Sequence, residues 1–503
     1  MKALFDNGAP PPCPSSFNFA AHVLRRADEL PDKIALAVMA MSGSERWSFG
    51  RLKAAVLGTA TGLAQQGLQR GDVVLIRLGN TVDFPIAYLG AIAGGFVPAP
   101  TSSQLTAPEV AKIAPQVQPR LVLTAPGVAC PEDLGCPQID LKTLRSFRDL
   151  PPATYDMGDP NRLAYILFTS GTSGKARPVA HAHRAIWARQ MMWADWYDLQ
   201  ESDRLLHAGA FNWSFTLGTG LMDPWTVGAT ALIPSEGTPL TALPLLLKRH
   251  DATILAAAPG VYRKLLQDHP KMDLPKLRHG LTAGEKMPAT VRREWEAATC
   301  CEVHEAFGMS ECSTFISGSP GHPAHGSLGR PQQGRRIAII GEDGPVKIGE
   351  EGLIAVSNRD PGLMLGYLGA EEETSARFQG EWFLTGDLGI MDKGFEIHYR
   401  GRADDMMNAG GYRVSPLEVE AALSQFTDVK EIAVTDVEIK VDTRVIAAFY
   451  VADKDIPEDT LKAFAEENLA RYKQPRLYRR VEALPRGANN KLLRRKLTLE
   501  GSQ

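Results

Sequence analysis

A short segment of the chain gathers hydroxyl, glycine and cationic side chains directly after an apolar stretch. Residues 163–168 are apolar and typical of a buried strand, and residues 169–177 then read TSGTSGKAR. Glycines let backbone N–H groups approach an anion closely, while the hydroxyls add donors and the two cations add positive charge. The segment therefore predicts a loop that binds a polyphosphate.

This segment is not a Walker loop. That pattern needs four residues between its glycines and a Ser or Thr after the Lys. Here two residues separate Gly171 from Gly174, and Ala176 follows Lys175. Taken by itself, the segment is equally typical of an ordinary Gly/Ser turn between strands.

Further segments with reactive or charged residues follow in order. Residues 306–311 read AFGMSE, 382–387 read WFLTGD, 401–405 read GRADD, 410–414 read GGYRV, and 484–486 (LPR) precede 491–495 (KLLRR). With the phosphate loop, they resemble the signature motifs of the adenylate-forming superfamily, which includes acyl-CoA synthetases, peptide-synthetase adenylation domains and firefly-type luciferases. The resemblance covers most of the chain and points to the acyl-CoA synthetase branch.

The resemblance implies an enzyme that activates a carboxylic acid with ATP. The carboxylate would attack the α-phosphorus, pyrophosphate would leave, and CoA would then take the acyl group from the acyl-adenylate. Such displacements are catalysed mostly by positioning and by charge neutralisation. The implied cofactors are ATP, Mg²⁺ and CoA.

By the same resemblance, the leaving phosphates would lie against Thr169, Ser170, Gly171, Thr172 and Gly174. The family's usual Pro-Lys-Gly ending is here Ala176-Arg177-Pro178, so Arg177 would supply the charge. Arginine is a planar fork and not a point cation. We therefore expect pyrophosphate release to differ from that of relatives.

The resemblance also assigns the residues around the metal and the nucleoside. Glu311 would hold Mg²⁺, a hard ion that favours carboxylate oxygens and phosphates. Taken by itself, Glu311 is more typical of a solvated surface glutamate beside a glycine turn. Phe307 and the loop Gly284-Glu285 would lie near adenine. Asp387 would accept hydrogen bonds from the ribose hydroxyls, and Arg402 would lie near the ribose and phosphate.

The two half-reactions are implied to use different parts of the last hundred residues. Lys491 would neutralise charge between the substrate carboxylate and the α-phosphate, although Asn490 replaces the glycine usual before this lysine. The C-terminal domain would then rotate about Asp404, since hinges are residues at the ends of elements. The loop that contains Gly410, Gly411 and Tyr412 would replace the lysine and line a tunnel for CoA.

The resemblance places Trp213, Gly308 and Met309 in the acyl pocket. Acetyl-CoA synthetases have Trp where this chain has Gly308, and that Trp restricts their pocket to two carbons. The glycine therefore predicts a larger acid. Segments around the pocket resemble both medium-chain acyl-CoA synthetases and benzoate-type CoA ligases, so a medium-chain aliphatic acid and an aromatic acid both stay open.

The periodicity of apolar residues predicts the helices and strands that carry these residues. Ser48 can cap a helix whose apolar face contains Leu52, Val56, Ala60 and Leu63. Residues 73–76 then read as a buried strand, and helix and strand patterns alternate to about residue 300. This alternation predicts an α/β fold with mostly parallel strands in several layers.

The sequence pattern changes after Gly326. Short strand patterns at 337–340 and 353–356, separated by turn residues, predict a β-rich subdomain. Helical spacing at 419–426 and 461–469 around a strand pattern at 445–451 predicts a smaller α+β unit. We expect an N-terminal adenylation domain at 1–403, with the ATP and acyl sites, and a mobile C-terminal domain at 404–503.

Composition narrows the class of protein. The chain has 503 residues, 44% of them hydrophobic and 22% charged, which is ordinary for a globular protein. Its net charge of −3 gives no reason to expect nucleic acid as a partner. Neither a signal sequence nor a membrane span is expected, and the six cysteines do not suggest a disulfide framework, so we expect a cytoplasmic protein. A homodimer stays open.

The sequence leaves two alternatives to the CoA ligase open. An adenylating enzyme could pass the acyl group to the phosphopantetheine of a carrier protein. A catalytically silent nucleotide-binding homologue would explain the departures at Arg177 and Asn490.

Overall fold

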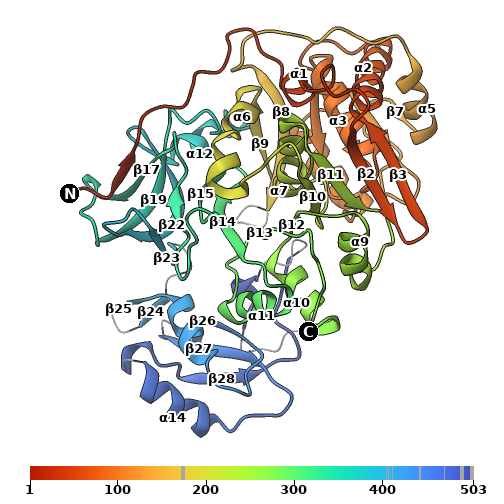
Figure 1. Cartoon of the computed structure of the whole chain (residues 1–503). Coiled ribbons are helices and arrows are strands. Elements are labelled where there is room, and N and C mark those ends of the chain that lie inside the picture. The colour runs from red at the N-terminus through yellow and green to blue at the C-terminus, as the bar shows by residue number, and fades with distance from the viewer. Residues whose placement is uncertain are drawn as a thin grey trace. The chain divides into compact units, whose positions relative to one another are not determined.

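The computed structural model describes residues 1–170, 176–403, 405, 407–409, 412–440, 443–469, 471–487 and 492–498 (Figure 1). The chain divides into two compact units. The C-terminal unit comprises Met1–Leu4, Ala338–Ala355 and Leu384–Gln503, and the N-terminal unit comprises Phe5–Ile337 and Val356–Phe383. The expected hinge between residues 403 and 404 concerns a rotation and stays a prediction.

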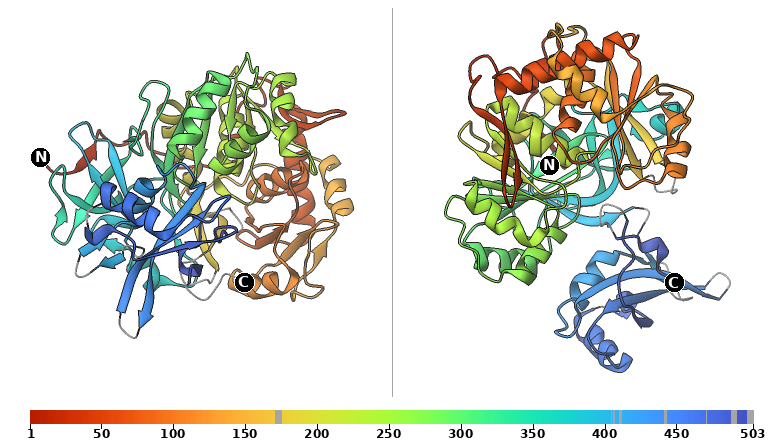
Figure 2. Two further views of the ribbon diagram at one scale, coloured as in Figure 1. Left: turned by 90° about the horizontal axis from the view of Figure 1, so that it is seen from below. Right: turned by 90° about the vertical axis from the view of Figure 1, so that its right-hand side faces the viewer.

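A nine-stranded sheet forms the centre of the N-terminal unit. Its strand order is β16-β15-β14-β13-β12-β10-β11-β2-β3, and the strands from β14 to β2 run parallel. The β2–β3 hairpin, red in Figures 1 and 2, forms one antiparallel edge. The bounds are β2 (Ile34–Ala40), β3 (Gly43–Ser48), β10 (Arg204–His207), β11 (Thr230–Pro234), β12 (Ile254–Ala256), β13 (His279–Ala283), β14 (Val303–Met309), β15 (Ser313–Ser317) and β16 (Arg330–Pro331).

Side chains of these strands alternate between two buried layers, because successive residues of a strand point to opposite faces. Leu206 packs with Tyr262 and Trp295 from the helices on one face. Its neighbour Leu205 belongs to a separate cluster with Phe215. The helices of the two layers are α9 (Leu243–Arg249), α10 (Pro259–Asp268) and α11 (Ala289–Thr299), and α6 (Arg184–Ala188), α7 (Ser214–Leu217) and α8 (Asp223–Val227).

A second, four-stranded parallel sheet has the order β5-β4-β6-β7. The hydroxyl of Ser48 accepts a hydrogen bond from the backbone N–H of Arg51 and caps α2, whose predicted apolar face is buried. This confirms the expected helix and the strand that follows it. The bounds are α1 (Phe19–Val23), α2 (Phe49–Gln65), β4 (Val73–Arg77), α3 (Asp83–Ala93), β5 (Val97–Pro100), α4 (Ala107–Ile113), β6 (Leu121–Thr124), β7 (Gln138–Ile139) and α5 (Leu141–Ser146).

A small antiparallel sheet has the order β20-β9-β8. Its strands are β8 (Leu163–Ser170), β9 (Ala176–Ala182) and β20 (Gly366–Tyr367), and the short helix α12 (Glu371–Ser375) follows β20. The predicted phosphate loop connects β8 to β9 along the chain.

The residues after Gly326 form mostly strands, as expected. Their sheet has the order β1-β17-β19-β22-β21, with β18 paired to β17 and β23 paired to β22. The bounds are β1 (Leu4–Asp6), β17 (Arg336–Gly341), β18 (Gly344–Pro345), β19 (Glu351–Ser357), β21 (Phe378–Gln379), β22 (Trp382–Met391) and β23 (Ile397–Arg402).

The last hundred residues form the predicted α+β arrangement around the sheet β26-β27-β28. On one face, Val434 packs with residues of α13 and α14. On the other, Phe449 packs with Leu484 and Leu497 from the end of the chain. The bounds are β24 (Met407–Ala409), β25 (Tyr412–Val414), α13 (Pro416–Leu423), β26 (Glu431–Lys440), β27 (Thr443–Val451), α14 (Glu458–Asn468) and β28 (Leu477–Arg480).

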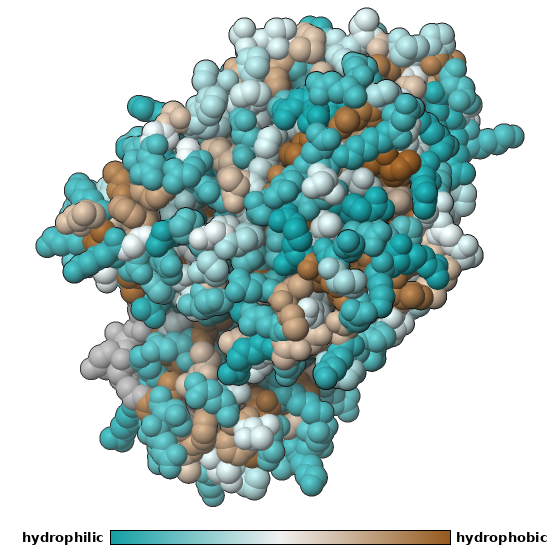
Figure 3. Space-filling view, in the orientation of Figure 1, coloured by the Kyte–Doolittle hydropathy of each residue, from teal (hydrophilic) through white to brown (hydrophobic). Residues whose placement is uncertain are grey.

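Exposed apolar residues are interspersed with hydrophilic ones on the face shown in Figure 3. Among the helices described, none combines the length and the apolar character that crossing a membrane requires.

Candidate functional site

The strands on either side of the phosphate loop are paired up to its edges. Thr169 lies opposite Arg177, and Ser170 lies opposite Ala176, in the antiparallel β8–β9 ladder. The predicted phosphate ligands Gly171, Thr172 and Gly174 lie outside the described residues. The pairing brings Arg177 beside the start of the loop, where its charge was expected.

Arg177 is already engaged by neighbours that the sequence did not predict. Its guanidinium forms an ion pair with Glu373 of α12 and lies 5.6 Å from the centre of the Tyr367 ring. A phosphate group that uses this arginine must therefore compete with the Glu373 carboxylate.

Glu311 is buried, with 8% of its surface exposed, so the interpretation of a solvated surface glutamate is wrong. The Tyr367 hydroxyl donates a hydrogen bond of 2.7 Å to its Oε1. Within the described part of the chain, no donor contacts Oε2. Mg²⁺ usually takes one or two carboxylates together with substrate phosphates. A buried carboxylate with one free oxygen fits that role.

Tyr367 connects the two predicted features. It pairs with Val179 of β9, its ring lies near Arg177, and its hydroxyl holds Glu311. Burial and the nearby Glu311 charge raise the pKa of Tyr367, so it stays a donor. Sequence analysis missed this residue because 56 positions separate it from Glu311.

His181 also positions the Glu311 segment. Its Nε2 lies 2.8 Å from the carbonyl oxygen of Ser310, and its ring stacks on Tyr165 at 4.8 Å. Because a carbonyl only accepts, Nε2 carries the proton. Burial lowers the pKa of His181 to about 4, so the imidazole is neutral at physiological pH. The only signal in the sequence is a histidine between the apolar residues Ala180 and Ala182.

Two predicted residues of the nucleoside and acyl region, Gly284 and Trp213, do come together. Gly284 follows β13 with φ +90°, and a Cβ placed on it would lie 2.7 Å from Cζ2 of Trp213. Ala283 pairs with Ala306 across β13 and β14, so Gly284 and Phe307 follow adjacent strand positions. The half-buried Glu285 comes next in the chain.

Gly308 has a packing reason that sequence analysis did not identify. The β14–β15 register shifts between Phe307 and Gly308, and a Cβ on Gly308 would lie 2.1 Å from the carbonyl oxygen of Ser313. Met309 pairs with Ser313 at the end of this ladder. A side chain at position 308 therefore requires the backbone opposite it to move.

Glu305, on the same strand, has an unusual acidity. Burial raises the pKa of its carboxyl to about 7, although Arg292 and the Met287 N–H lower it. A carboxyl whose folded pKa exceeds its unfolded value of about 4.5 stabilises the fold below that value, and the contribution is lost as pH rises through about 7.

We therefore predict that Glu305→Gln shows little change in thermal midpoint at pH 5 and a higher midpoint than the parent protein at pH 8. The carboxylate costs at most about 3 kcal/mol at the higher pH, from roughly 1.4 kcal/mol per pKa unit. Calorimetry from pH 5 to pH 8 tests this, with the exposed Glu294→Gln as control. A parallel pH profile in the two variants would contradict the prediction.

Asp387 and Arg402 are brought together within the C-terminal unit. They face each other across β22 and β23, with Arg402 Nη1 3.3 Å from Asp387 Oδ2. The Tyr399 hydroxyl donates to Asp387 Oδ1 at 2.8 Å. Asp387 is buried, with 7% of its surface exposed. The sequence did not indicate Tyr399. The pairing of β22 with β23 places its hydroxyl beside Asp387.

The remaining predicted residues of this unit, Asp404, Gly410, Gly411 and Lys491, lie outside the described residues. Of Tyr412 the backbone is described, and it pairs with Ala409 in the β24–β25 hairpin.

The chain on both sides of residue 491 is anchored. Arg486 and Leu492 form an isolated antiparallel β-bridge. The Leu493 N–H donates a hydrogen bond of 2.8 Å to the Pro485 carbonyl. The guanidinium of Arg494 donates hydrogen bonds to both carboxylate oxygens of Glu420 in α13. The distances from Nη2 are 2.9 Å to Oε1 and 2.7 Å to Oε2. This ion pair, which sequence analysis missed, fixes the end of the chain to α13.

Comparison with known proteins gives consistent matches. Residues 23–368 match the family described as AMP-binding enzyme, and residues 418–491 match the AMP-binding enzyme C-terminal domain. The benzoate–CoA ligase of Thauera aromatica is 32% identical, over 86% of each chain. The mitochondrial acyl-coenzyme A synthetase ACSM3 of Homo sapiens is 28% identical, over 96% of this chain and 89% of its own.

A solved structure of a benzoate CoA ligase from Burkholderia xenovorans LB400 has a TM-score of 0.84 and 27% identity, covering 95% of this chain and 99% of that one. The motifs, the fold and these matches together show that the chain belongs to the AMP-binding enzymes of the adenylate-forming superfamily, in their acyl-CoA synthetase branch.

Proposed function

We propose that this protein is an ATP-dependent carboxylate–CoA ligase that forms an acyl-adenylate and then an acyl-CoA thioester. The observation that carries the proposal is the buried Glu311 carboxylate. It accepts a hydrogen bond from Tyr367, and Tyr367 pairs with β9, the strand that follows the phosphate loop. Among the described residues Glu311 has no salt-bridge partner. A buried carboxylate of this kind is costly, and a Mg²⁺–nucleotide complex would compensate its charge.

In this proposal each group has one task. The β8–β9 loop and Arg177 hold the phosphates that leave. Glu311 would ligate Mg²⁺, which neutralises phosphate charge when it is bound. Asp387, oriented by Tyr399 and Arg402, accepts hydrogen bonds from the ribose hydroxyls.

Lys491 neutralises the charge that builds up between the acid and the α-phosphate. In the second half-reaction, rotation at Asp404 replaces Lys491 by the loop of Gly410, Gly411 and Tyr412, beside which CoA enters. The relatives named as benzoate and medium-chain acyl ligases support an aromatic or medium-chain acid as substrate. We also propose a cytoplasmic location, although the ACSM3 relative is named as mitochondrial.

A thioester-formation screen tests the function directly. Purified protein with ATP, Mg²⁺ and CoA is offered a panel of aliphatic and aromatic acids, and AMP and acyl-CoA are measured. We expect acid-dependent AMP and an equal amount of thioester. Absence of AMP with every acid would contradict the proposal and favour the silent homologue. Acyl transfer to a holo carrier protein but not to CoA would favour the carrier-loading alternative.

The Arg177–Glu373 pair leads to a prediction about ATP. Since phosphate must compete with Glu373, Glu373→Gln is expected to lower KM for ATP without raising kcat. Exposed ion pairs are worth up to about 1 kcal/mol, so we expect no more than a roughly five-fold decrease. Steady-state kinetics with varied ATP measure it, with Glu371→Gln on the same helix as control. An increased KM would show that Glu373 assists ATP binding.

Position 308 gives a prediction about the acid. If the missing side chain leaves room for a large acyl group, Gly308→Trp should shift preference toward acetate. Because a Cβ there meets the Ser313 carbonyl, the variant is also expected to unfold at a lower temperature. Relative kcat/KM values for acetate, hexanoate and benzoate test the first point, with Gly308→Ala as the control for strain alone. An unchanged ranking of acids would remove Gly308 from the acyl pocket.

A further inference from the structure

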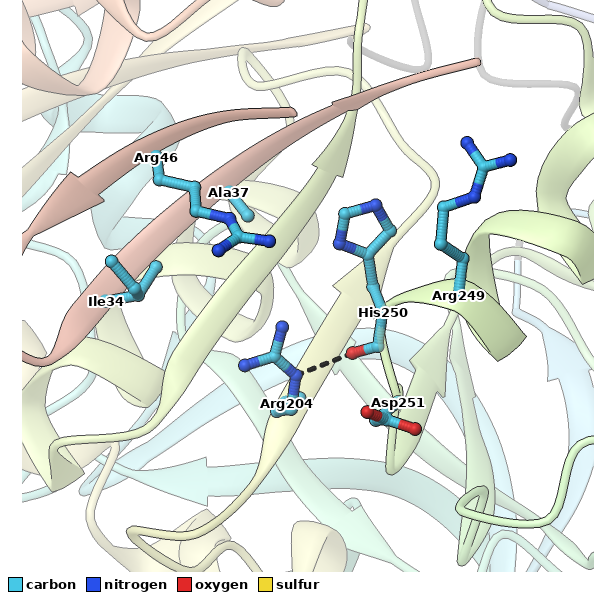
Figure 4. Close-up of a pocket in the computed structure, with 7 residues that line it drawn as sticks. All are labelled: Ile34, Ala37, Arg46, Arg204, Arg249, His250 and Asp251. Carbon is cyan, nitrogen blue, oxygen red and sulfur yellow. Dashed lines mark hydrogen bonds between the residues drawn. The ribbon is translucent and has the colours of Figure 1, made fainter. Parts of the chain in front are cut away.

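A cavity of about 260 Å³ lies at the amino-terminal ends of strands in the nine-stranded sheet (Figure 4). Arg204 is the first residue of β10, Ile34 is the first of β2, and His250 and Asp251 precede β12. The lining of this arginine cavity comprises Ile34, Ala37, Arg46, Arg204, Arg249, His250 and Asp251.

The arginine cavity is separate from the candidate nucleotide and acyl residues. Gly284 and Phe307 lie at the opposite, carboxyl-terminal ends of the parallel strands β13 and β14. A strand of four or five residues is roughly 13–17 Å long at 3.3 Å per residue. A ligand in the arginine cavity therefore does not contact those residues.

The cavity gathers positive charge that no carboxylate pairs with directly. Arg204 Nε donates to the His250 carbonyl at 2.6 Å, and Arg249 Nη1 donates to the Met41 carbonyl at 2.8 Å. Arg46 makes a long contact of 3.3 Å to the Ser44 hydroxyl. In the described ranges, none of the three guanidiniums forms an ion pair. Each has five N–H donors, so most remain available.

His250 adds a buried ring nitrogen without a hydrogen-bond partner among the described residues. The residue is 6% exposed, and the nitrogen is Nε2. Figure 4 shows its ring standing between the Arg46 and Arg249 side chains. Burial and the charges of Arg204, Arg46 and Arg249 lower the pKa of His250, whereas Asp251 raises it. An unpaired buried polar group costs free energy, which an anionic acceptor would recover by accepting a hydrogen bond from a protonated Nε2.

We propose that the arginine cavity binds a phosphoryl oxyanion, as inorganic phosphate or as the phosphate of a monoester. Guanidinium forks match the oxygens of phosphate and form charge-assisted hydrogen bonds with them. The lining carries three cationic side chains against one carboxylate, Asp251. Figure 4 shows the Asp251 carboxylate on the far side of the His250 backbone from the imidazole, and Arg46 and Arg204 on one side of the ring, so the anion lies between these two arginines and the ring.

Titration calorimetry with the full chain at constant ionic strength tests the proposal. Inorganic phosphate is titrated without nucleotide, because AMP is itself a phosphate monoester and would compete for the cavity. We expect one bound phosphate per chain. The double variant Arg46→Gln/Arg249→Gln should bind it at least about ten-fold more weakly, since charged hydrogen bonds are strong. This variant separates cavity binding from any binding at the phosphate loop. The control is Arg293→Gln, an exposed arginine on α11.

Two further measurements identify the site and the source of the anion. Sulfate does not change its protonation near neutral pH. The heat of sulfate binding is therefore measured in two buffers of different ionisation enthalpy, and the difference gives the number of protons that His250 takes up. Uptake of a proton by the parent protein, lost in His250→Gln, supports the site. Tighter binding of glycerol phosphate than of phosphate assigns a monoester, and equal binding assigns inorganic phosphate. Absence of binding, or equal affinity in the double variant and the Arg293→Gln control, would overturn the proposal.

Discussion

Lys491→Ala is expected to abolish acyl-adenylate formation while sparing thioester formation from synthetic acyl-adenylate. In the proposed function the lysine neutralises charge only in the first half-reaction, and loss of one such electrostatic contact typically costs about 100- to 1,000-fold in rate. Pyrophosphate–ATP exchange measures the first step, and single-turnover conversion of added acyl-adenylate with CoA measures the second.

The control for this experiment is Lys496→Ala, an exposed lysine in the same segment. It should leave both half-reactions unchanged. An equal loss of both steps in Lys491→Ala would count against the assigned role, because a lysine needed only for adenylation cannot slow the second step. The thermal midpoint should be unaffected in either variant.

Glu311→Gln is expected to produce the second large effect. The amide keeps the size of the side chain and can still accept from Tyr367, but it removes the charge that a divalent cation requires. The apparent affinity for Mg²⁺ should fall by about 10-fold or more, since even residues that only support a metal ligand are worth roughly 10–100-fold. AMP formation is measured as a function of Mg²⁺ at saturating ATP and acid.

Tyr367→Phe serves as the matched variant, because it removes the hydroxyl that orients Oε1 and leaves the charge in place. It should lower activity less than Glu311→Gln and retain the dependence on Mg²⁺. If Glu311→Gln has the same Mg²⁺ dependence as the parent protein, the carboxylate is not the metal ligand.

Local features of the fold were predictable because neighbouring residues decide them. The cap at Ser48 and the buried face of α2 follow from helical periodicity alone. The strands at 445–451 and 353–356 follow from runs of branched and apolar side chains. The motifs likewise predict which residue types bind phosphate, metal and ribose, and these roles stay predictions.

Contacts between distant segments were not predictable from the sequence. The Arg177–Glu373 pair, the Tyr367–Glu311 hydrogen bond and the Arg494–Glu420 pair each join residues more than 50 positions apart. Charged residues such as Glu311 are usually exposed, so its burial runs against the ordinary expectation for its type.

Periodicity and motifs are local properties of the chain, so the α/β class and the family resemblance could be read from the sequence alone. The burial of Glu311 against Tyr367, the lack of room for a Cβ at Gly308 and the three arginines around His250 are evident only in the folded chain. Burial, close backbone approach and charge pairing depend on which distant segments pack together, and local sequence patterns do not contain that information.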